Sequence, residues 1–108
     1  MALLGGEAAP SPAVAAAVPG AVRVSGANRY ATAVAIAAQL WSRPAGGYVL
    51  TAGDHPDGWA YALAAAGLAA DADSPVLLVE TARLPAETRA RTCSTGSTGA
   101  RPRLERDC

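Results

Sequence analysis

Short apolar runs alternate with alanine-rich stretches along this 108-residue chain. The apolar runs are 2–4, 22–24, 48–52 and 75–79, and an alanine-rich segment follows each of the first three. The last run is unbroken, as in a strand that is covered on both faces of a parallel sheet. Such alternation is typical of parallel strands joined by crossover helices.

We therefore predict an α/β fold: a parallel sheet with helices on both faces, in a doubly wound, Rossmann-like arrangement that is incomplete in this chain. Helices are expected at 11–18, 28–41 and 59–70, and a fourth beginning near Pro85. Ser11 and Asn28 are the residue types that cap helix N-termini. The apolar positions of the second helix share one face, at the spacing of an amphipathic helix: Tyr30, Ala33, Val34, Ala37 and Trp41.

The apolar residues are numerous but small. They make up 51% of the chain, yet phenylalanine is absent and only two Trp and three Tyr occur. Alanine, valine and leucine must therefore form the core of what is expected to be one domain.

The charge balance is neutral, with nine Arg against nine acidic residues. Such a chain has no net field to attract nucleic acid, so we expect no nucleic-acid partner. No apolar run approaches the roughly 20 residues of a membrane-spanning helix. No Arg or Lys precedes Arg23, so we expect no secretory signal peptide.

The turn before the second helix contains the best candidate for binding. Asn28 and Arg29 open a helix whose N-terminal N–H groups favour an anion, and an Arg side chain can hold a carboxylate or phosphate at two points. The structural alternative is a helix cap followed by a solvated or internally paired Arg. The chain contains neither GxGxxG nor GxxxxGK[ST], so the sequence does not support a glycine-rich nucleotide-binding loop.

A second polar group follows the third apolar run: Asp54, His55 and Asp57. A carboxylate beside an imidazole can serve acid–base chemistry or bind a metal. Because His55 is the only histidine, we favour a solvated loop and expect no metal site, cofactor or catalysis. Trp59 and Tyr61 fit either stacking on a sugar ring or, as we favour, helix packing.

Beyond about Ala90 the apolar periodicity ends, and the chain becomes rich in Ser, Thr, Gly and Arg. We predict an irregular or disordered segment over 91–108. Cys93 and Cys108 both lie in its span. They fit either a disulfide or, as we favour, two free thiols.

The run RVSGANRYATA, from Arg23 to Ala33, is similar to the start of a cell-wall-binding repeat 2 unit. That start usually reads Arg-Leu-(Ser/Ala)-Gly-(Ala/Ser)-(Asp/Asn)-Arg-Tyr-x-Thr-Ala. The similarity continues through YVLTAGD at 48–54, ALAAAGLAA at 62–70, SPVLLVE at 74–80 and LPAETRA at 84–90. By this resemblance, 1–20 is the tail of a preceding repeat, 21–90 is a truncated repeat and 91–108 lies outside it.

The resemblance implies a non-catalytic module that holds a surface protein on an anionic cell-wall glycopolymer, beside adjacent repeats of the same family. It implies a location at the cell surface of a Gram-positive organism. The expected polymer contacts are Arg23, Ser25, Asn28 and Arg29, with Asp54, His55 and Asp57 as secondary candidates.

One departure weakens the secondary candidates. The family usually has Asp directly before Ala-Leu-Ala, where this chain has Tyr61. Two other functions remain open: a small nucleotide- or phosphate-binding α/β domain, and a purely structural repeat.

Overall fold

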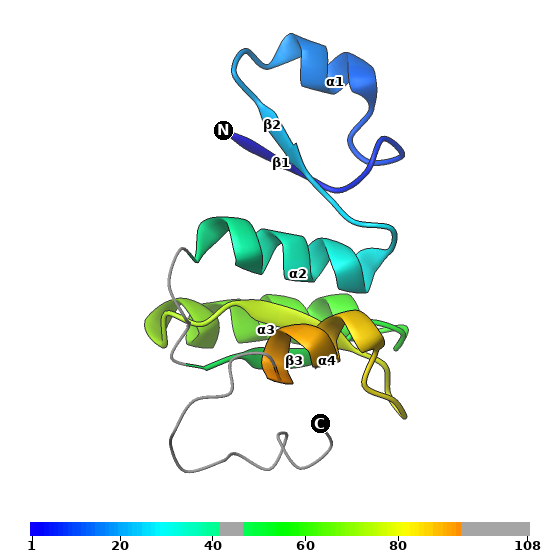
Figure 1. The fold of residues 1–108 in the computed structure, drawn as a ribbon, viewed down its shortest axis with the longest axis vertical. Helices are drawn as coiled ribbons and strands as arrows, with labels where there is room; N and C mark the ends of the chain where they lie inside the picture. Colours follow the sequence, from blue (N-terminus) through cyan, green and yellow to red (C-terminus); the bar gives the residue numbers. More distant parts are fainter. Residues whose placement is uncertain (42–46, 94–108) are drawn as a thin grey trace.

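The structure, a computed structural model, describes residues 1–41 and 47–93, with Cys93 described by its backbone alone. Strands and helices alternate throughout these residues (Figure 1). They are β1 (Ala2–Leu4), α1 (Pro12–Ala17), β2 (Val22–Val24), α2 (Arg29–Leu40), β3 (Val49–Ala52), α3 (Gly58–Asp71), β4 (Val76–Val79) and α4 (Ala86–Cys93). The predicted α/β alternation is therefore confirmed.

The strands pair in parallel, but they form two separate sheets within the described residues. In the first sheet β1 pairs with β2, with Leu3 opposite Arg23. In the second sheet β3 pairs with β4, with Leu50 opposite Leu77. The expectation of one doubly wound sheet is thus corrected: α2 lies between the two sheets (Figure 1), so β2 does not reach β4.

Both predicted N-caps are present. The Ser11 side chain accepts a hydrogen bond from Val14 N, and Pro12 is the first residue of α1. The Asn28 side chain accepts from Ala31 N at 2.8 Å. Each bond satisfies one N–H group that the helix itself cannot pair, so the sequence defines where these two helices begin.

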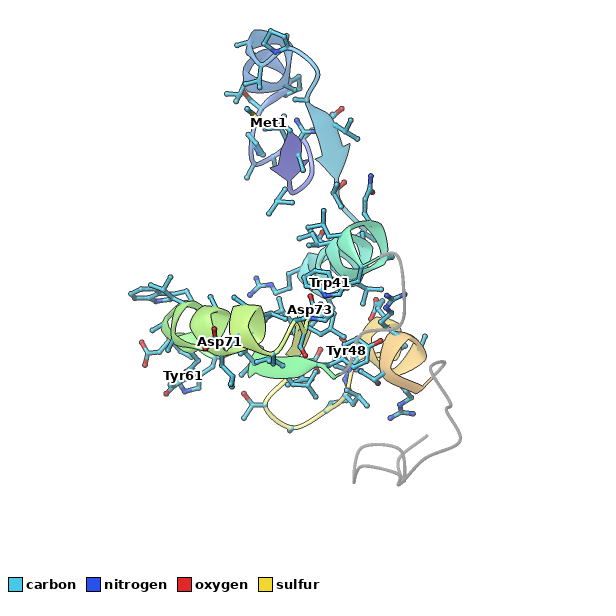
Figure 2. The ribbon with its side chains drawn as sticks, turned by 90° about the vertical axis from the view of Figure 1, so that its left-hand side faces the viewer. Met1, Trp41, Tyr48, Tyr61, Asp71 and Asp73 are labelled. Carbon is cyan, nitrogen blue, oxygen red and sulfur yellow. The ribbon has the colours of Figure 1, made fainter. Side chains whose placement is uncertain are left out.

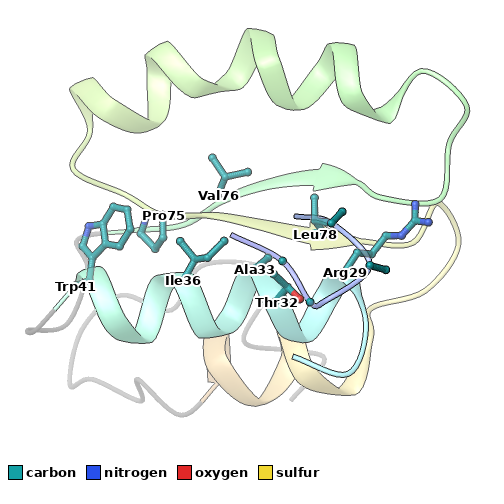
Figure 3. A pocket seen from close by; sticks show the side chains of 12 residues that line it. Arg29, Thr32, Ala33, Ile36, Trp41, Pro75, Val76 and Leu78 are labelled. Carbon is teal, nitrogen blue, oxygen red and sulfur yellow. The ribbon is translucent and has the colours of Figure 1, made fainter. Parts of the chain in front are cut away.

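The core lies between α2 and the second sheet. Ala33, Ala37 and Leu77 are buried there, and four partly buried apolar side chains pack around them: Val34, Tyr48, Leu50 and Leu78. The predicted apolar face of α2 is therefore the face that packs on β4. Helix α3 covers the other face of this sheet, so helices lie on both of its faces (Figure 3).

Helix α3 turns its smallest residues toward the sheet. Gly58 and Ala69 are buried, and a Cβ on Gly58 would lie 2.3 Å from the Ala52 carbonyl oxygen. This close approach leaves the large side chains outside. Trp59 is 71% exposed and Tyr61 53% exposed, so the favoured interpretation of these two as packing residues is wrong.

One side-chain contact holds the C-terminal end of α2. The Trp41 indole N–H donates to the Asp73 carbonyl oxygen at 3.2 Å, which ties the end of α2 to the turn after α3 (Figure 2). Helix α4 continues to Cys93, so residues 91–93 are helical. The rest of the predicted irregular segment, and any pairing of Cys93 with Cys108, lie outside the described residues.

Candidate functional site

Polar side chains from four segments meet where β3 and β4 end: the start of α2, the loop after β3, the loop after β4 and the first turn of α4. We call this region the carboxyl edge: Asn28, Arg29, Tyr30, Asp54, Glu80, Thr81, Arg83 and Glu87. In a parallel sheet the strands end at one edge, and the helices that follow them begin there. The sequence therefore brings N-terminal helix residues and strand-end loops to the same place.

Asn28 joins two helices at this edge. Its side-chain oxygen caps α2, and its side-chain nitrogen donates to Glu87 Oε1 at 3.0 Å. This hydrogen bond from Asn28 lowers the pKa of the Glu87 carboxyl below its usual value. Both polar atoms of the Asn28 side chain thus have protein partners, which favours a structural role for this residue.

Arg29 covers the end of β3. Its Nη1 donates to the Gly53 carbonyl oxygen. A Cβ on Gly53 would lie 3.1 Å from Tyr30 Cε1 and 3.4 Å from Arg29 Cδ. The absence of a side chain at Gly53 therefore lets Arg29 and Tyr30 lie close over the strand end, with the Arg29 side chain exposed.

Asp54 holds the loop that follows β4. One of its carboxylate oxygens accepts from Thr81 N at 2.8 Å and from Thr81 Oγ1 at 2.9 Å. Burial alone would raise the pKa of Asp54, but the two bonds from Thr81, together with a backbone hydrogen bond and the nearby His55, outweigh it, and the pKa is lowered. A carboxylate used in this way braces two loops against each other.

Glu80 and Arg83 form a two-point ion pair. Arg83 Nη2 and Nε donate to the two Glu80 oxygens at 2.7 and 2.8 Å. This pairing lowers the pKa of Glu80 and raises the pKa of Arg83. Burial, with the nearby charges of Glu80 and Asp54, raises the pKa of Tyr30. Each carboxylate at the edge therefore has its own donor.

Arg23 and Ser25 lie at the first sheet, apart from this network. Arg23 Nη1 donates to the carbonyl oxygens of Gly5 and Gly6, at 2.9 and 2.8 Å. These bonds close the loop that follows β1. Ser25 is exposed. The structure thus divides the four predicted contacts: two belong to the first sheet and two to the carboxyl edge.

The secondary candidates do not form one cluster. His55 Nδ1 accepts from Asp57 N at 3.1 Å, and the His55 ring lies 5.6 Å from the ring of Tyr61. Asp57 precedes α3 without a side-chain cap bond, while Asp54 bonds to Thr81. Within the described residues, no three His, Cys, Asp or Glu side chains gather closely enough to hold a metal ion.

Sequence reasoning missed the part of the edge that follows β4. Glu80, Thr81, Arg83 and Glu87 were not singled out, although parallel strands must end together. It also missed two threonines with structural bonds. Thr32 Oγ1 accepts from Gly26 N at 3.0 Å, and the buried Thr88 donates to the Leu78 carbonyl oxygen at 2.6 Å.

None of the helices in the described ranges is both long and apolar enough to cross a bilayer. No curated protein and no solved structure gives a significant match to the chain.

The family model of cell wall binding domain 2 (CWB2) does match, over residues 23–102, which is well over half of the chain. Its first residue is Arg23, where the RVSGANRYATA run begins. The family is one of binding domains, and membership indicates association with the cell wall. The chain therefore belongs to the cell wall binding domain 2 (CWB2) family.

Proposed function

We propose that this chain is a non-catalytic module that helps to anchor a surface protein to an anionic cell-wall polymer, in an array with neighbouring repeats. The observation that carries the proposal is the exposed position of Arg29 at the start of α2. Arg29 is the first residue of this helix, and its guanidinium reaches the end of β3 at the Gly53 carbonyl oxygen. Guanidinium and helix N–H groups together suit a phosphate or carboxylate.

Arg29 has more N–H donors than its bond to Gly53 uses. A guanidinium carries five N–H donors, and Arg29 gives one nitrogen, Nη1, to Gly53 within the described residues. The carboxylates nearby already have partners: Glu80 has Arg83, and Asp54 has Thr81. They therefore do not hold Arg29 in a closed ion pair.

The surrounding charges limit the strength of this contact. Asp54, Glu80 and Glu87 share the edge with the two arginines Arg29 and Arg83, so the region has no strong positive field. Binding must then depend on short-range contacts rather than on long-range attraction. One module should bind weakly, and several linked modules should bind much more tightly because the later contacts are intramolecular.

Arg23 is proposed as a second contact and Ser25 as its neighbour. Arg23 uses Nη1 for Gly5 and Gly6, which leaves the donors of its other nitrogens. Asn28 fixes the turn between them, because its cap and its bond to Glu87 hold the start of α2.

Co-sedimentation with purified cell-wall sacculi tests the proposal. The chain is expected to sediment with intact sacculi, to be released by added salt, and to remain in solution with sacculi stripped of their anionic polymers. Arg29→Gln should weaken binding several-fold. Arg89→Gln is the matched control, because it removes the same charge from an exposed position on α4.

Three outcomes would overturn the proposal. Equal binding to stripped sacculi would exclude the anionic polymer, and equal loss in Arg29→Gln and Arg89→Gln would exclude a site at Arg29. Thermal stabilisation by nucleotides, with no binding to sacculi, would instead favour a phosphate-binding domain.

A further inference from the structure

The outer edge of β4 pairs with no strand among residues 1–41 and 47–93. An open groove of about 610 Å³ runs beside β4 and α2. Its walls include Val76 and Leu78 of β4, Ala33 and Ile36 of α2, and Gly5 and Ala9 of the loop after β1 (Figure 3). We propose that the β2 strand of a second copy of this chain fills this edge, so that two copies exchange their β1–β2 units.

The handedness of the crossovers selects this edge of the sheet. Helix α3 connects β3 to β4 on one face, and α2 lies on the opposite face (Figure 3). Crossovers between parallel strands are right-handed in nearly all proteins. Two right-handed crossovers on opposite faces run across a sheet in opposite directions. A strand that precedes α2 therefore belongs beyond β4, where the groove lies, and not beyond β3.

The backbone of β4 directs some of its peptide groups away from β3, toward the place where such a strand would pair. Val49 N donates to Pro75 O at 3.0 Å, and Gly53 N donates to Val79 O at 2.7 Å. Because successive peptide groups of a strand point to opposite sides, Val76 and Leu78 direct theirs away from β3. The buried Thr88 of α4 already donates to Leu78 O, so α4 covers this edge at that oxygen. The β3–β4 register therefore leaves Leu78 N–H and both polar groups of Val76 on the side away from β3.

The backbone of β2 offers the matching groups. Val22 N donates to Met1 O at 2.9 Å, and Gly5 N donates to Val24 O at 3.0 Å. The peptide groups of Arg23 therefore point away from β1. With Arg23 of one copy opposite Leu77 of the other, Arg23 N donates to Val76 O, and Leu78 N donates to Arg23 O.

This register also pairs the side chains. It sets Val22 opposite Val76 and Val24 opposite Leu78, on one face of the joined sheet. Val22 is 55% exposed in the single chain, so the exchange covers apolar surface that is otherwise open to water. The joined sheet has the order β3, β4, β2, β1, with the last two strands from the second copy. Four parallel strands then lie side by side, as the sequence predicts.

A second copy fits better than the chain's own β2 because the turn before α2 is braced. Gly26 N donates to Thr32 Oγ1 at 3.0 Å, and Asn28 caps Ala31 N at 2.8 Å. A Cβ on Gly26 would lie 2.5 Å from the Ala31 Cβ, so the turn is tight. It holds β2 on the far side of α2 from the chain's own β4 (Figure 1). Exchange of such a unit between identical chains is a common route to dimers.

Disulfide trapping tests the exchange. In a Cys93→Ser, Cys108→Ser background, one preparation carries Val22→Cys and another carries Val76→Cys. The proposed register places these two Cα atoms about 5 Å apart, within the range of a disulfide. Mixing the two preparations under mild oxidation should give a cross-linked heterodimer, and light scattering should show twice the monomer mass. Val22→Cys mixed with Val49→Cys is the control, because β4 separates β3 from β2 in the joined sheet, and it should not cross-link.

Three results would overturn the proposal. One is a monomer at all concentrations. Another is an intramolecular disulfide in the chain that carries both Val22→Cys and Val76→Cys, because the chain's own β2 would then fill the edge. The third is equal cross-linking with Val49→Cys. A second variant, Val76→Pro, removes an outward N–H that β3 does not use and that this register directs to Ala21 O of the other copy, so it should fold as a monomer. A dimer of Val76→Pro as stable as the parent would also count against strand pairing.

Discussion

Asn28 donates a hydrogen bond to Glu87 across 59 positions of sequence and so links the first turn of α2 to the first turn of α4. The same side chain caps α2 through its oxygen. One amide therefore holds two helix starts at the carboxyl edge.

Replacement of Asn28 should show how much its two side-chain hydrogen bonds contribute to the free energy of unfolding. Asn28→Ala removes the cap and the link to Glu87, and we expect a loss of about 1–2 kcal/mol in the free energy of unfolding, measured by urea denaturation. Asn28→Asp keeps the cap oxygen but places a carboxylate against Glu87, so its loss should come mainly from repulsion. The double variant Asn28→Asp, Glu87→Gln should recover stability. No recovery would show that the contact with Glu87 does not contribute.

Two glycines should respond to alanine in opposite directions. Gly26→Ala places a Cβ 2.5 Å from Ala31 Cβ and should destabilise the chain by roughly 1–3 kcal/mol. Gly67, within α3, has no heavy atom within 4 Å of an added Cβ. Gly67→Ala should therefore stabilise the chain by up to about 1 kcal/mol through helix propensity. Thermal denaturation followed by circular dichroism measures both, and a destabilised Gly67→Ala would contradict the open surface of α3.

Thr88 should be sensitive to loss of its hydroxyl. It is fully buried, and its Oγ1 donates to Leu78 O at 2.6 Å. Thr88→Val keeps the shape but leaves that carbonyl oxygen without its donor, at a cost of about 1–3 kcal/mol. Thr88→Ser keeps the hydroxyl and loses one methyl group, so a smaller loss of about 1 kcal/mol is expected. If both variants lose the same free energy of unfolding, packing rather than the hydrogen bond is what matters at this position.

Low pH should weaken the hydrogen bonds of the carboxyl edge and so lower the stability of the fold. The pKa values of Asp54 and Glu87 are lowered by hydrogen bonds from Thr81 and Asn28. A carboxyl with a lowered pKa in the folded state stabilises the fold above its unfolded pKa of about 4, and this contribution is lost as the pH falls through the folded value. The urea midpoint should therefore fall as the pH drops below about 5.

Asp54→Asn serves as the control for that pH dependence. It should lower stability at neutral pH and make the urea midpoint less dependent on acid. An unchanged acid dependence in both Asp54→Asn and Glu87→Gln would show that these two hydrogen bonds do not set it.

The local structure could be predicted because its causes are local. Asn28 is a capping residue, the apolar face of α2 is visible in the spacing of Ala33 and Ala37, and the short apolar runs favour strands. These signals depend on neighbours within one or two turns of chain. The bounds of the elements therefore lie within a few residues of those expected.

The candidate site could be predicted only in part. Arg29 and Asn28 were found because they begin a helix after a strand, but their partners were not. Gly53 and Glu87 lie far away in sequence, and no local pattern shows that they meet Arg29 and Asn28. The exposed positions of Trp59 and Tyr61 were also missed, because only the close packing of Gly58 on Ala52 shows which side of α3 faces the sheet.

The sequence alone determined the alternation of strands and helices, the parallel pairing and the membership in a cell-wall-binding family. Only the tertiary structure decided that the strands form two sheets. It also decided that Arg23 donates to the loop after β1 in the first sheet, while Arg29 donates to the end of β3 in the second. The physical reason is that element type follows from spacing and capping along the chain. The pairing of sheet edges depends on the direction of one tight turn, which Gly26 and Asn28 set through contacts in three dimensions.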